Sequence, residues 1–377
     1  EVADASERAS IRSLYNATLL KTFASGAEHW RLHRSEDLDT VLGQLGAERS
    51  IAYAERNWLG EPYLDPNDPV FVAGKQWALK NTGQAFTWSC PNLPAPPLCV
   101  NDADIDADEA WAIVQGSSSV NVAIVDGGIS YNHPDFAANV WYNSPEVVNG
   151  QDDDGNGYVD DLVGFDFYNN QPDPTDTNLF QHGTSCASIA GARGNNGRNV
   201  AGTSWSVKLM ALKGAEGMHY PESELIEAID YAAAEGADII NASWGGFPFS
   251  QAMKAAIKGA HDEEILFVEA AGNAGCNIDD PNDPDNNPGC RADFDRRYPQ
   301  RLDSKNLIVV AGSHCNDWKI GVTNWGPVSV DLAAPGSFIY RLRYNVGSGE
   351  YDDEGCFAGT SAAAPHVAGV AALIRAI

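Results

Sequence analysis

Four polar side chains, spread over most of the chain, could together cleave an acyl bond. They are Asp126, His182, Asn273 and Ser361. A serine hydroxyl becomes an effective nucleophile when a histidine takes its proton and a carboxylate orients that histidine. A side-chain amide can then donate a hydrogen bond to the oxyanion that develops on the attacked carbonyl. Each residue alone also has an ordinary interpretation, as a turn residue or a helix cap.

Ser361 has small residues on both sides, which leaves room for a substrate to approach its hydroxyl. Apolar residues with helical spacing follow it, so we expect the serine at the N-terminus of a helix. That end of a helix carries unpaired N–H groups and a partial positive charge, which suit a developing anion.

Alternating strand and helix patterns begin near residue 120 and must position these side chains. Strands are predicted at 120–125, 207–212, 239–243, 266–270 and 307–311, and helices at 183–192, 222–234, 251–260 and from 361 onward. This alternation is typical of an α/β domain with a mostly parallel central sheet and helices on both faces. Functional residues in such sheets lie at the carboxyl ends of the strands, where we expect both Asp126 and Asn273.

The order Asp, His, Ser and the flanking residues resemble the subtilisin-like serine peptidases over roughly residues 76–377. The resemblance implies that Ser361 is the nucleophile, His182 the base and Asp126 the carboxylate that fixes the histidine tautomer. It implies that Asn273 and the backbone N–H of Ser361 form the oxyanion hole. Protein or peptide substrates are expected.

The resemblance also implies a substrate cleft with backbone on both sides. Its walls would be Ser243-Trp244-Gly245 on one side and Ala270-Ala271-Gly272 on the other, with an extended peptide pairing to them.

Two positions depart from the usual family pattern, Cys186 and Ala362, which follows the nucleophile. The sequence around each of them is similar to that of kexin-type proteases. One interpretation is a thiol near His182 that mercurials or oxidants would attack. The other is a small buried residue that packs the helix. The kexin likeness stops at Pro365, so a dibasic preference does not follow.

The run from Asp152 to Asp161 places oxygen ligands in the pattern of an EF-hand loop, with Gly157 at the sharp turn. The predicted ligands of a structural Ca²⁺ ion are Asp152, Asp154, Asn156, the Tyr158 carbonyl and Asp160. Val163 stands where an EF-hand has glutamate, so Asp161 or Asp166 is the expected replacement. The run resembles a calcium loop of bacterial subtilases and of apicomplexan egress subtilisins; a solvated acidic turn is the alternative.

Composition excludes some classes of function. The formal charge of −28 disfavours nucleic-acid binding, and no apolar run is long enough to span a membrane. Seven cysteines favour an oxidising compartment, either secreted or secretory/periplasmic, rather than the cytosol. Local disulfides are predicted for Cys90 with Cys99 and for Cys276 with Cys290, and a weaker one for Cys315 with Cys356, which leaves Cys186 free.

Three regions are expected along the chain: residues 1–62 as a small α+β domain, 63–119 as a linker and extension, and 120–377 as the catalytic domain. Within the first, helices are predicted inside 6–23 and at 37–45, and strands at 28–33 and 50–54. This domain resembles the family's propeptide, a chaperone and inhibitor whose tail lies in the cleft. An α+β cap of unrelated role is the alternative.

The sequence therefore predicts a calcium-stabilised, secreted or organellar serine endopeptidase, a monomer and zymogen that processes its own propeptide. Limited processing of one partner protein, or peptide ligation, would use the same residues. A prodomain-locked binding protein without turnover is the alternative from a different class.

Overall fold

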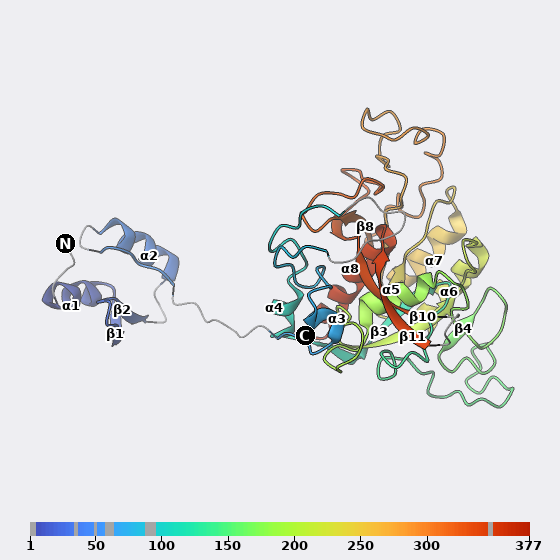
Figure 1. The fold of residues 1–377 in the computed structure, drawn as a ribbon, viewed down its shortest axis with the longest axis horizontal. Coiled ribbons are helices and arrows are strands. Elements are labelled where there is room, and N and C mark those ends of the chain that lie inside the picture. Colours follow the sequence, from blue (N-terminus) through green and yellow to red (C-terminus); the bar gives the residue numbers. More distant parts are fainter. Residues whose placement is uncertain (1–4, 34–36, 49–50, 57–63, 87–95, 346–349) are drawn as a thin grey trace. The chain divides into compact units, whose positions relative to one another are not determined.

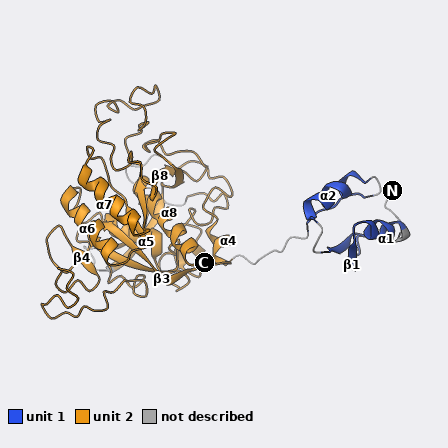
Figure 2. Cartoon of the chain, turned by 180° about the vertical axis from the view of Figure 1, so that it is seen from behind, with its two compact units in different colours: residues 1–62 blue, residues 63–377 orange. Residues whose placement is uncertain are grey.

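A computed structural model describes residues 5–33, 37–48, 51–56, 64–86, 96–345 and 350–377 of the chain. The chain divides into two compact units, Glu1–Pro62 and Tyr63–Ile377, which are coloured separately in Figure 2. The candidate catalytic residues all belong to the second unit.

The first unit contains two helices and an antiparallel strand pair. Their bounds are α1 (Ala5–Leu14), β1 (Ala17–Thr22), β2 (Glu28–Leu32) and α2 (Leu38–Ala47). Ile11, Val41 and Leu45 form its small buried core. The helix predicted inside 6–23 is α1, which ends at Leu14, and Asn16 then takes a left-handed backbone conformation (φ 50°) that turns the chain into β1. Residues 51–54 form no strand, contrary to prediction, and residue 50 and residues 57–62 lie outside the described part.

A seven-stranded sheet organises the second unit (Figure 1). Every neighbouring pair of strands in it is parallel, and the strand order is β4-β5-β3-β6-β7-β8-β9. The strands are β3 (Gly116–Asp126), β4 (Gly164–Asp166), β5 (Ser206–Lys213), β6 (Ile239–Ala242), β7 (Leu266–Ala270), β8 (Leu307–Ser313) and β9 (Leu332–Pro335). The helices are α3 (Pro69–Val72), α4 (Ala107–Trp111), α5 (His182–Gly191), α6 (Glu222–Ala234), α7 (Gln251–Asp262) and α8 (Thr360–Arg375).

The central strand β3 shows why helices cover both faces of the sheet. Val122 and Ile124 point into a core shared with α5 and α8, whereas Ala123 and Val125 point into a second core shared with α6 and α7. Successive side chains of a strand face opposite ways, so the run 122–125, which is apolar at every position, needs cover on each side. The α/β fold class predicted from the sequence is confirmed.

The expected strands and helices of the catalytic region are confirmed within a few residues at their ends. The short strands β4 and β9, the helices α3 and α4, and the antiparallel hairpin of β10 (Ile339–Asn345) and β11 (Glu350–Phe357) were not predicted. β10 packs against α5, the helix that begins with His182.

The disulfide pattern corrects part of the prediction. Cys276 pairs with Cys290 as expected, but Cys99 pairs with Cys315, so the predicted pairs of Cys99 with Cys90 and Cys315 with Cys356 are wrong. Short loops favoured the local pairings. Tertiary packing decides otherwise, because the Val100 N–H donates to the Cys315 carbonyl (2.9 Å) and holds the two segments together. Cys356 is also disulfide-bonded, and Cys90 lies outside the described residues.

Among the helices that the structure describes, none has both the length and the apolar character that crossing a bilayer requires.

Candidate active site

Asp126 and His182 meet at the carboxyl end of the sheet. Asp126 is the last residue of β3 and His182 the first of α5, and Nδ1 of the imidazole lies 2.9 Å from each carboxylate oxygen of Asp126. The neighbouring Gly183 makes this approach possible, because a Cβ there would lie 2.2 Å from the carbonyl oxygen of Gly128. The pair is therefore held by strand, helix and a close backbone contact.

The electrostatics of this pair favour a charged imidazole. Burial opposes protonation of His182, but the charge and hydrogen bond of Asp126, together with the neighbouring Cys186, favour it, and the pKa of His182 is raised well above its usual value. Asp126 is fully buried and also accepts hydrogen bonds from the Gly127 N–H (2.7 Å) and the Tyr220 hydroxyl (3.4 Å). These contacts fix the carboxylate that orients the imidazole.

Ser361 lies in the first turn of α8, after Gly359, whose φ of 118° suits glycine. Its hydroxyl donates to the carbonyl of Ser243 (3.1 Å), the residue that follows β6. Among the described residues, no hydrogen bond joins this hydroxyl to His182. Hydrogen bonds of this kind are often long or misaligned before substrate binds, so the geometry leaves a base role for His182 open.

Asn273 follows β7 and is oriented by the residue before Ser361. Its Oδ1 accepts from the backbone N–H of Thr360 at 2.9 Å. Since a backbone N–H can only donate, this contact identifies the side-chain oxygen and leaves the Nδ2 amino group as the donating end. A Cβ at Gly359 would lie 3.1 Å from both amide atoms of Asn273, so glycine there allows this close packing.

Cys186 lies between His182 and Ser361. Its Sγ is 4.0 Å from the His182 Nδ1 and donates to the Ser361 carbonyl at 3.3 Å. It is the free cysteine of the described residues and is buried. Burial raises the pKa of its thiol, so Cys186 stays neutral at physiological pH.

The two segments predicted to bind substrate both contact the start of α8. Ser243 accepts the Ser361 hydroxyl and donates its own hydroxyl to the Ser361 carbonyl (3.2 Å). The Gly272 N–H donates to the Thr360 Oγ1 at 3.0 Å. The indole of Trp244 donates to the Val125 carbonyl (2.7 Å) and so anchors its segment to β3. The segments 243–245 and 270–272 thus continue from the paired strands β6 and β7 to the start of α8.

The acidic loop gathers three carboxylates, one of which the sequence analysis missed. Oxygens of Glu146, Asp152 and Asp154 all lie within 4.8 Å of one another. Glu146 is buried, its Oε1 accepts from the Asp153 N–H (2.7 Å), and its Oε2 has no hydrogen-bond partner within the described structure. Hydrogen bonds from the N–H groups of Gly157 and its neighbours lower the pKa of Asp152, so this carboxylate is charged.

Other predicted ligands in this loop have different contacts. The carboxylate of Asp160 accepts from the N–H groups of Asn149 and Gly150 at 2.8 to 3.0 Å. The amide of Asn156 donates to Asp161 (2.9 Å) and to Glu235 (3.1 Å), which ties the loop to the end of α6. The buried Asp166 is paired with Lys213 (3.3 Å) away from the cluster.

The hairpin β10–β11 supplies further residues that the sequence analysis did not identify. Arg341 donates to the Phe180 carbonyl and to the Ser185 hydroxyl, both at 2.6 Å. The Gln181 side chain donates to the Tyr344 carbonyl at 2.9 Å. These contacts clamp the residues on both sides of His182. Arg341 and Arg343 interrupt the apolar pattern of this strand, and they are the signal that the sequence offers for this role.

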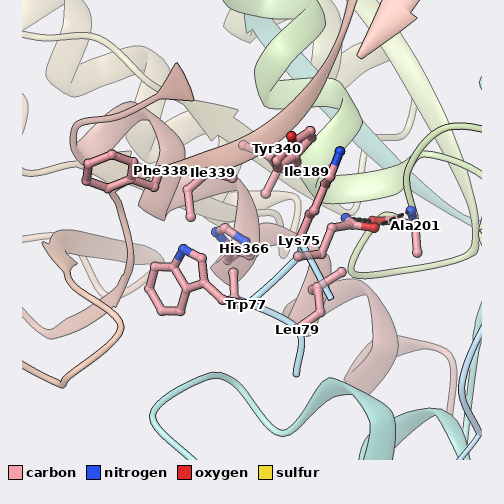
Figure 3. A pocket seen from close by; sticks show the side chains of 11 residues that line it. Lys75, Trp77, Leu79, Ile189, Ala201, Phe338, Ile339, Tyr340 and His366 are labelled. Atoms are coloured by element: carbon pink, nitrogen blue, oxygen red, sulfur yellow. Dashed lines mark hydrogen bonds between the residues drawn. The ribbon is translucent and has the colours of Figure 1, made fainter. Parts of the chain in front are cut away.

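A small cavity lies elsewhere in the second unit, and Figure 3 shows the side chains that line it. Its volume is about 10 Å³, near the least that holds one water molecule. His366, Trp77 and Tyr340 are among its lining residues, and burial lowers the pKa of His366 to about 4. Nδ1 of the neutral His366 donates to the Ala362 carbonyl (2.8 Å), and the ring lies outside the candidate site.

Comparisons with known proteins point to one family. The profile of the Subtilase family matches residues 117–376. The chain is 33% identical over 281 residues to Subtilisin-like protease 1 of Plasmodium vivax, covering 72% of this chain and 43% of that protein. It is 34% identical over 271 residues to thermitase of Thermoactinomyces vulgaris, covering 72% of this chain and 79% of that protein. The chain thus spans less than half of the length of the Plasmodium vivax relative.

A solved structure is also similar. It belongs to a protease of Pseudoalteromonas arctica PAMC 21717, with a TM-score of 0.59 and 26% sequence identity, and the match covers 83% of this chain and 87% of the other. Because the family profile takes in most of the sheet and its helices, from β3 through α8, the chain belongs to the subtilase family.

Proposed function

We propose that this chain is a serine endopeptidase that hydrolyses peptide bonds through an acyl-enzyme on Ser361. The observation that supports this most is the buried Asp126 carboxylate bonded to His182 beside the helix end that carries Ser361. That set matches the chemical requirements of a nucleophile, a base and a group that holds the base.

The first step transfers a proton and forms a bond. Because Nδ1–H of His182 is bonded to Asp126, Nε2 is the nitrogen that accepts the Ser361 proton while Oγ attacks the substrate carbonyl. The Ser361 hydroxyl must rotate about its Cα–Cβ bond, since it now donates to Ser243. Collapse of the tetrahedral intermediate breaks the C–N bond, and the amine leaves with the proton from His182. Water then hydrolyses the ester by the same steps.

Two donors hold the oxyanion in this proposal. They are the Nδ2 amino group of Asn273 and the backbone N–H of Ser361, which lies in the first turn of α8 where N–H groups lack helical partners. Because the Thr360 N–H already holds the side chain of Asn273, the amide needs little reorganisation when the oxyanion charge develops.

An extended peptide would bind between the segments 243–245 and 270–272. Their backbone groups can pair with the substrate main chain, as a sheet edge does. This placement puts the scissile carbonyl beside Ser361, because both segments already contact the start of α8.

We assign a structural Ca²⁺ ion to the acidic loop. Glu146, Asp152 and Asp154 would hold it, since calcium prefers carboxylate oxygens and Glu146 offers a buried oxygen with no partner among the described residues. Glu146 would supply the carboxylate that an EF-hand takes from its twelfth position. The ion would stabilise the loop and take no part in the reaction.

The unit Glu1–Pro62 is proposed as an inhibitory propeptide, and the protein as secreted. Its own small core supports a separately folded unit. The disulfides of Cys99 with Cys315 and Cys276 with Cys290 fit an oxidising compartment.

A fluorophosphonate probe tests the enzymatic proposal, because it reacts with an activated serine. The full chain and its Ser361→Ala variant would be incubated until any autoprocessing ends, then labelled and weighed by mass spectrometry. We expect a label on Ser361 and a cut between about residues 54 and 70 in the wild type, and neither in the variant. Folded wild-type protein that stays unlabelled would refute the proposal.

A further inference from the structure

A buried glutamine closes the space between the two proposed substrate-binding segments. The Nε2 of Gln300 donates to the carbonyl of Trp244 (3.2 Å) on one side and to the carbonyl of Ala270 (3.0 Å) on the other. It therefore bridges the two chain segments just beyond the last paired residues of β6 and β7, Ala242 and Glu269.

Glu269 is the third acceptor of the Gln300 amide and fixes its orientation. Its Oε1 accepts from the same Gln300 Nε2 at 2.7 Å, the shortest of the three contacts. Glu269 is 0% exposed and Gln300 4% exposed. An amide nitrogen has only two hydrogens for these three acceptors, so Gln300 has no spare donor for a ligand.

The backbone around Gln300 fixes its position further. A Cβ at Gly245 would lie 2.0 Å from the Gln300 Nε2, so the amide packs directly on the substrate-binding segment. Tyr298, two residues before Gln300, contacts the chain directly after the segment 243–245. Its carbonyl accepts from the N–H groups of Gly246 and Phe247 at 3.2 and 3.1 Å. The side chain of Gln300 is thus held from two directions.

We propose that Gln300 and Glu269 form the floor of the pocket for the substrate residue that donates the acyl group, and that this floor restricts the pocket to short side chains. The inference rests on the proposed function, because it takes Ser361 as the nucleophile. The expected substrates carry glycine, alanine, serine or threonine at this position, here called P1.

The cost of moving the floor explains the exclusion of long side chains. The Oε2 of Glu269 is already buried without a partner in the described structure. An aromatic or leucine P1 side chain would have to displace Gln300, which would leave Oε1 unpaired as well. A buried polar group without its hydrogen bond is strongly unfavourable. A short side chain leaves the bridge intact.

The test is a set of peptides that differ only at P1, with alanine, serine, leucine or phenylalanine, cleaved by the processed protein. We expect kcat/KM for alanine and serine to exceed that for phenylalanine about 10-fold or more. Gln300→Ala should raise the ratio of kcat/KM for the phenylalanine peptide to kcat/KM for the alanine peptide about 10-fold or more. Gln76→Ala is the matched control, because Gln76 also bridges buried backbone, at Ala201, away from this site.

The inference would be overturned by wild-type protein that cleaves the phenylalanine peptide as well as the alanine peptide. It would equally be overturned by a Gln300→Ala variant that labels with fluorophosphonate but keeps the wild-type ranking. Gln76→Ala changing the ranking as Gln300→Ala does would also overturn it, since the effect would then follow from lost stability. Labelling of Ser361 distinguishes a failure of this inference from a failure of the proposed function. If Ser361 is labelled but the P1 ranking is wrong, only the proposed pocket floor of Gln300 and Glu269 is refuted. If Ser361 is not labelled, the proposed function is refuted and this inference with it.

Discussion

The thiol of Cys186 donates a hydrogen bond to the backbone carbonyl of Ser361 across 3.3 Å, and thereby joins α5 to α8 inside the site. The same carbonyl accepts from the Ser243 hydroxyl at 3.2 Å. Three segments distant in sequence therefore converge on the backbone of one residue. This convergence fixes the start of α8 relative to His182 before any substrate is bound.

Replacing Cys186 tests whether this thiol is a packing residue or a reactive one. We expect Cys186→Ala to lower the free energy of unfolding by about 1–2 kcal/mol through the lost contact and the small cavity. Fluorophosphonate labelling of Ser361 should persist. Because burial raises the pKa of the thiol, native protein should resist iodoacetamide at pH 8 and react only when unfolded. Rapid alkylation of the folded protein would contradict this packing role.

The pH dependence of cleavage should report His182. Only the neutral imidazole accepts the serine proton, so activity is lost as pH falls through the pKa of His182. The pKa of His182 is raised well above 6.5 against the opposing effect of burial, and the charge and hydrogen bond of Asp126 contribute to that rise, so the acid limb of kcat/KM should titrate above pH 6.5.

Asp126→Asn removes the charge that raises this pKa and should move the acid limb to lower pH. It should also reduce kcat about 10⁴-fold through the wrong histidine tautomer. The measurement is kcat/KM as a function of pH for the wild type and for Asp126→Asn, with the same peptide. An acid limb at the same pH in both would show that Asp126 does not set the pKa of His182.

Much of the fold follows from the pattern of apolar residues. The strand and helix periods of the catalytic unit place Asp126, Asn273 and Ser361 at element ends, and the structure places them at the same edge of the sheet. The sequence pattern predicts this placement without knowledge of distant contacts, because all strands of a parallel sheet have their carboxyl ends at the same edge.

Contacts between distant segments could not be predicted in this way. Cys99 and Cys315 are separated by 216 residues, and only the folded chain brings them together. Glu146 precedes the calcium-like loop in a stretch with no ligand spacing of its own. Glu269 did carry a signal, since a carboxylate within the apolar strand at 266–270 requires a buried partner. The identity of that partner, Gln300, depends on tertiary packing.

Asn273 offers a substitution that separates its two roles. Asn273→Asp keeps an oxygen to accept the Thr360 N–H but replaces the donating amino group with a negative charge. We expect the melting temperature to change little and kcat to fall at least about 10²–10³-fold, with a smaller effect on KM. Asn273→Ala should lose comparable activity and also some stability. An Asp variant with nearly normal kcat would exclude Asn273 from the oxyanion hole.

Calcium binding at the acidic loop should stabilise the folded chain. A ligand that binds only the native state adds stability that grows with its concentration, about 2.7 kcal/mol at 100 times the dissociation constant. Excess EDTA should therefore lower the melting temperature of the Ser361→Ala chain, in which self-cleavage is absent, and added Ca²⁺ should restore it. No response to EDTA would refute a stabilising calcium site in the protein.

Two matched substitutions then identify the ligands. Glu146→Gln removes a charge from the cluster with Asp152 and Asp154, so the gain in melting temperature with Ca²⁺ should shrink. Asp160→Asn is the control, because the Asp160 carboxylate accepts from the Asn149 and Gly150 N–H groups instead of joining that cluster. Its response to Ca²⁺ should stay close to that of the parent chain. If Asp160→Asn abolished the response and Glu146→Gln did not, the ion would be held by the EF-hand-like pattern of the sequence and not by Glu146.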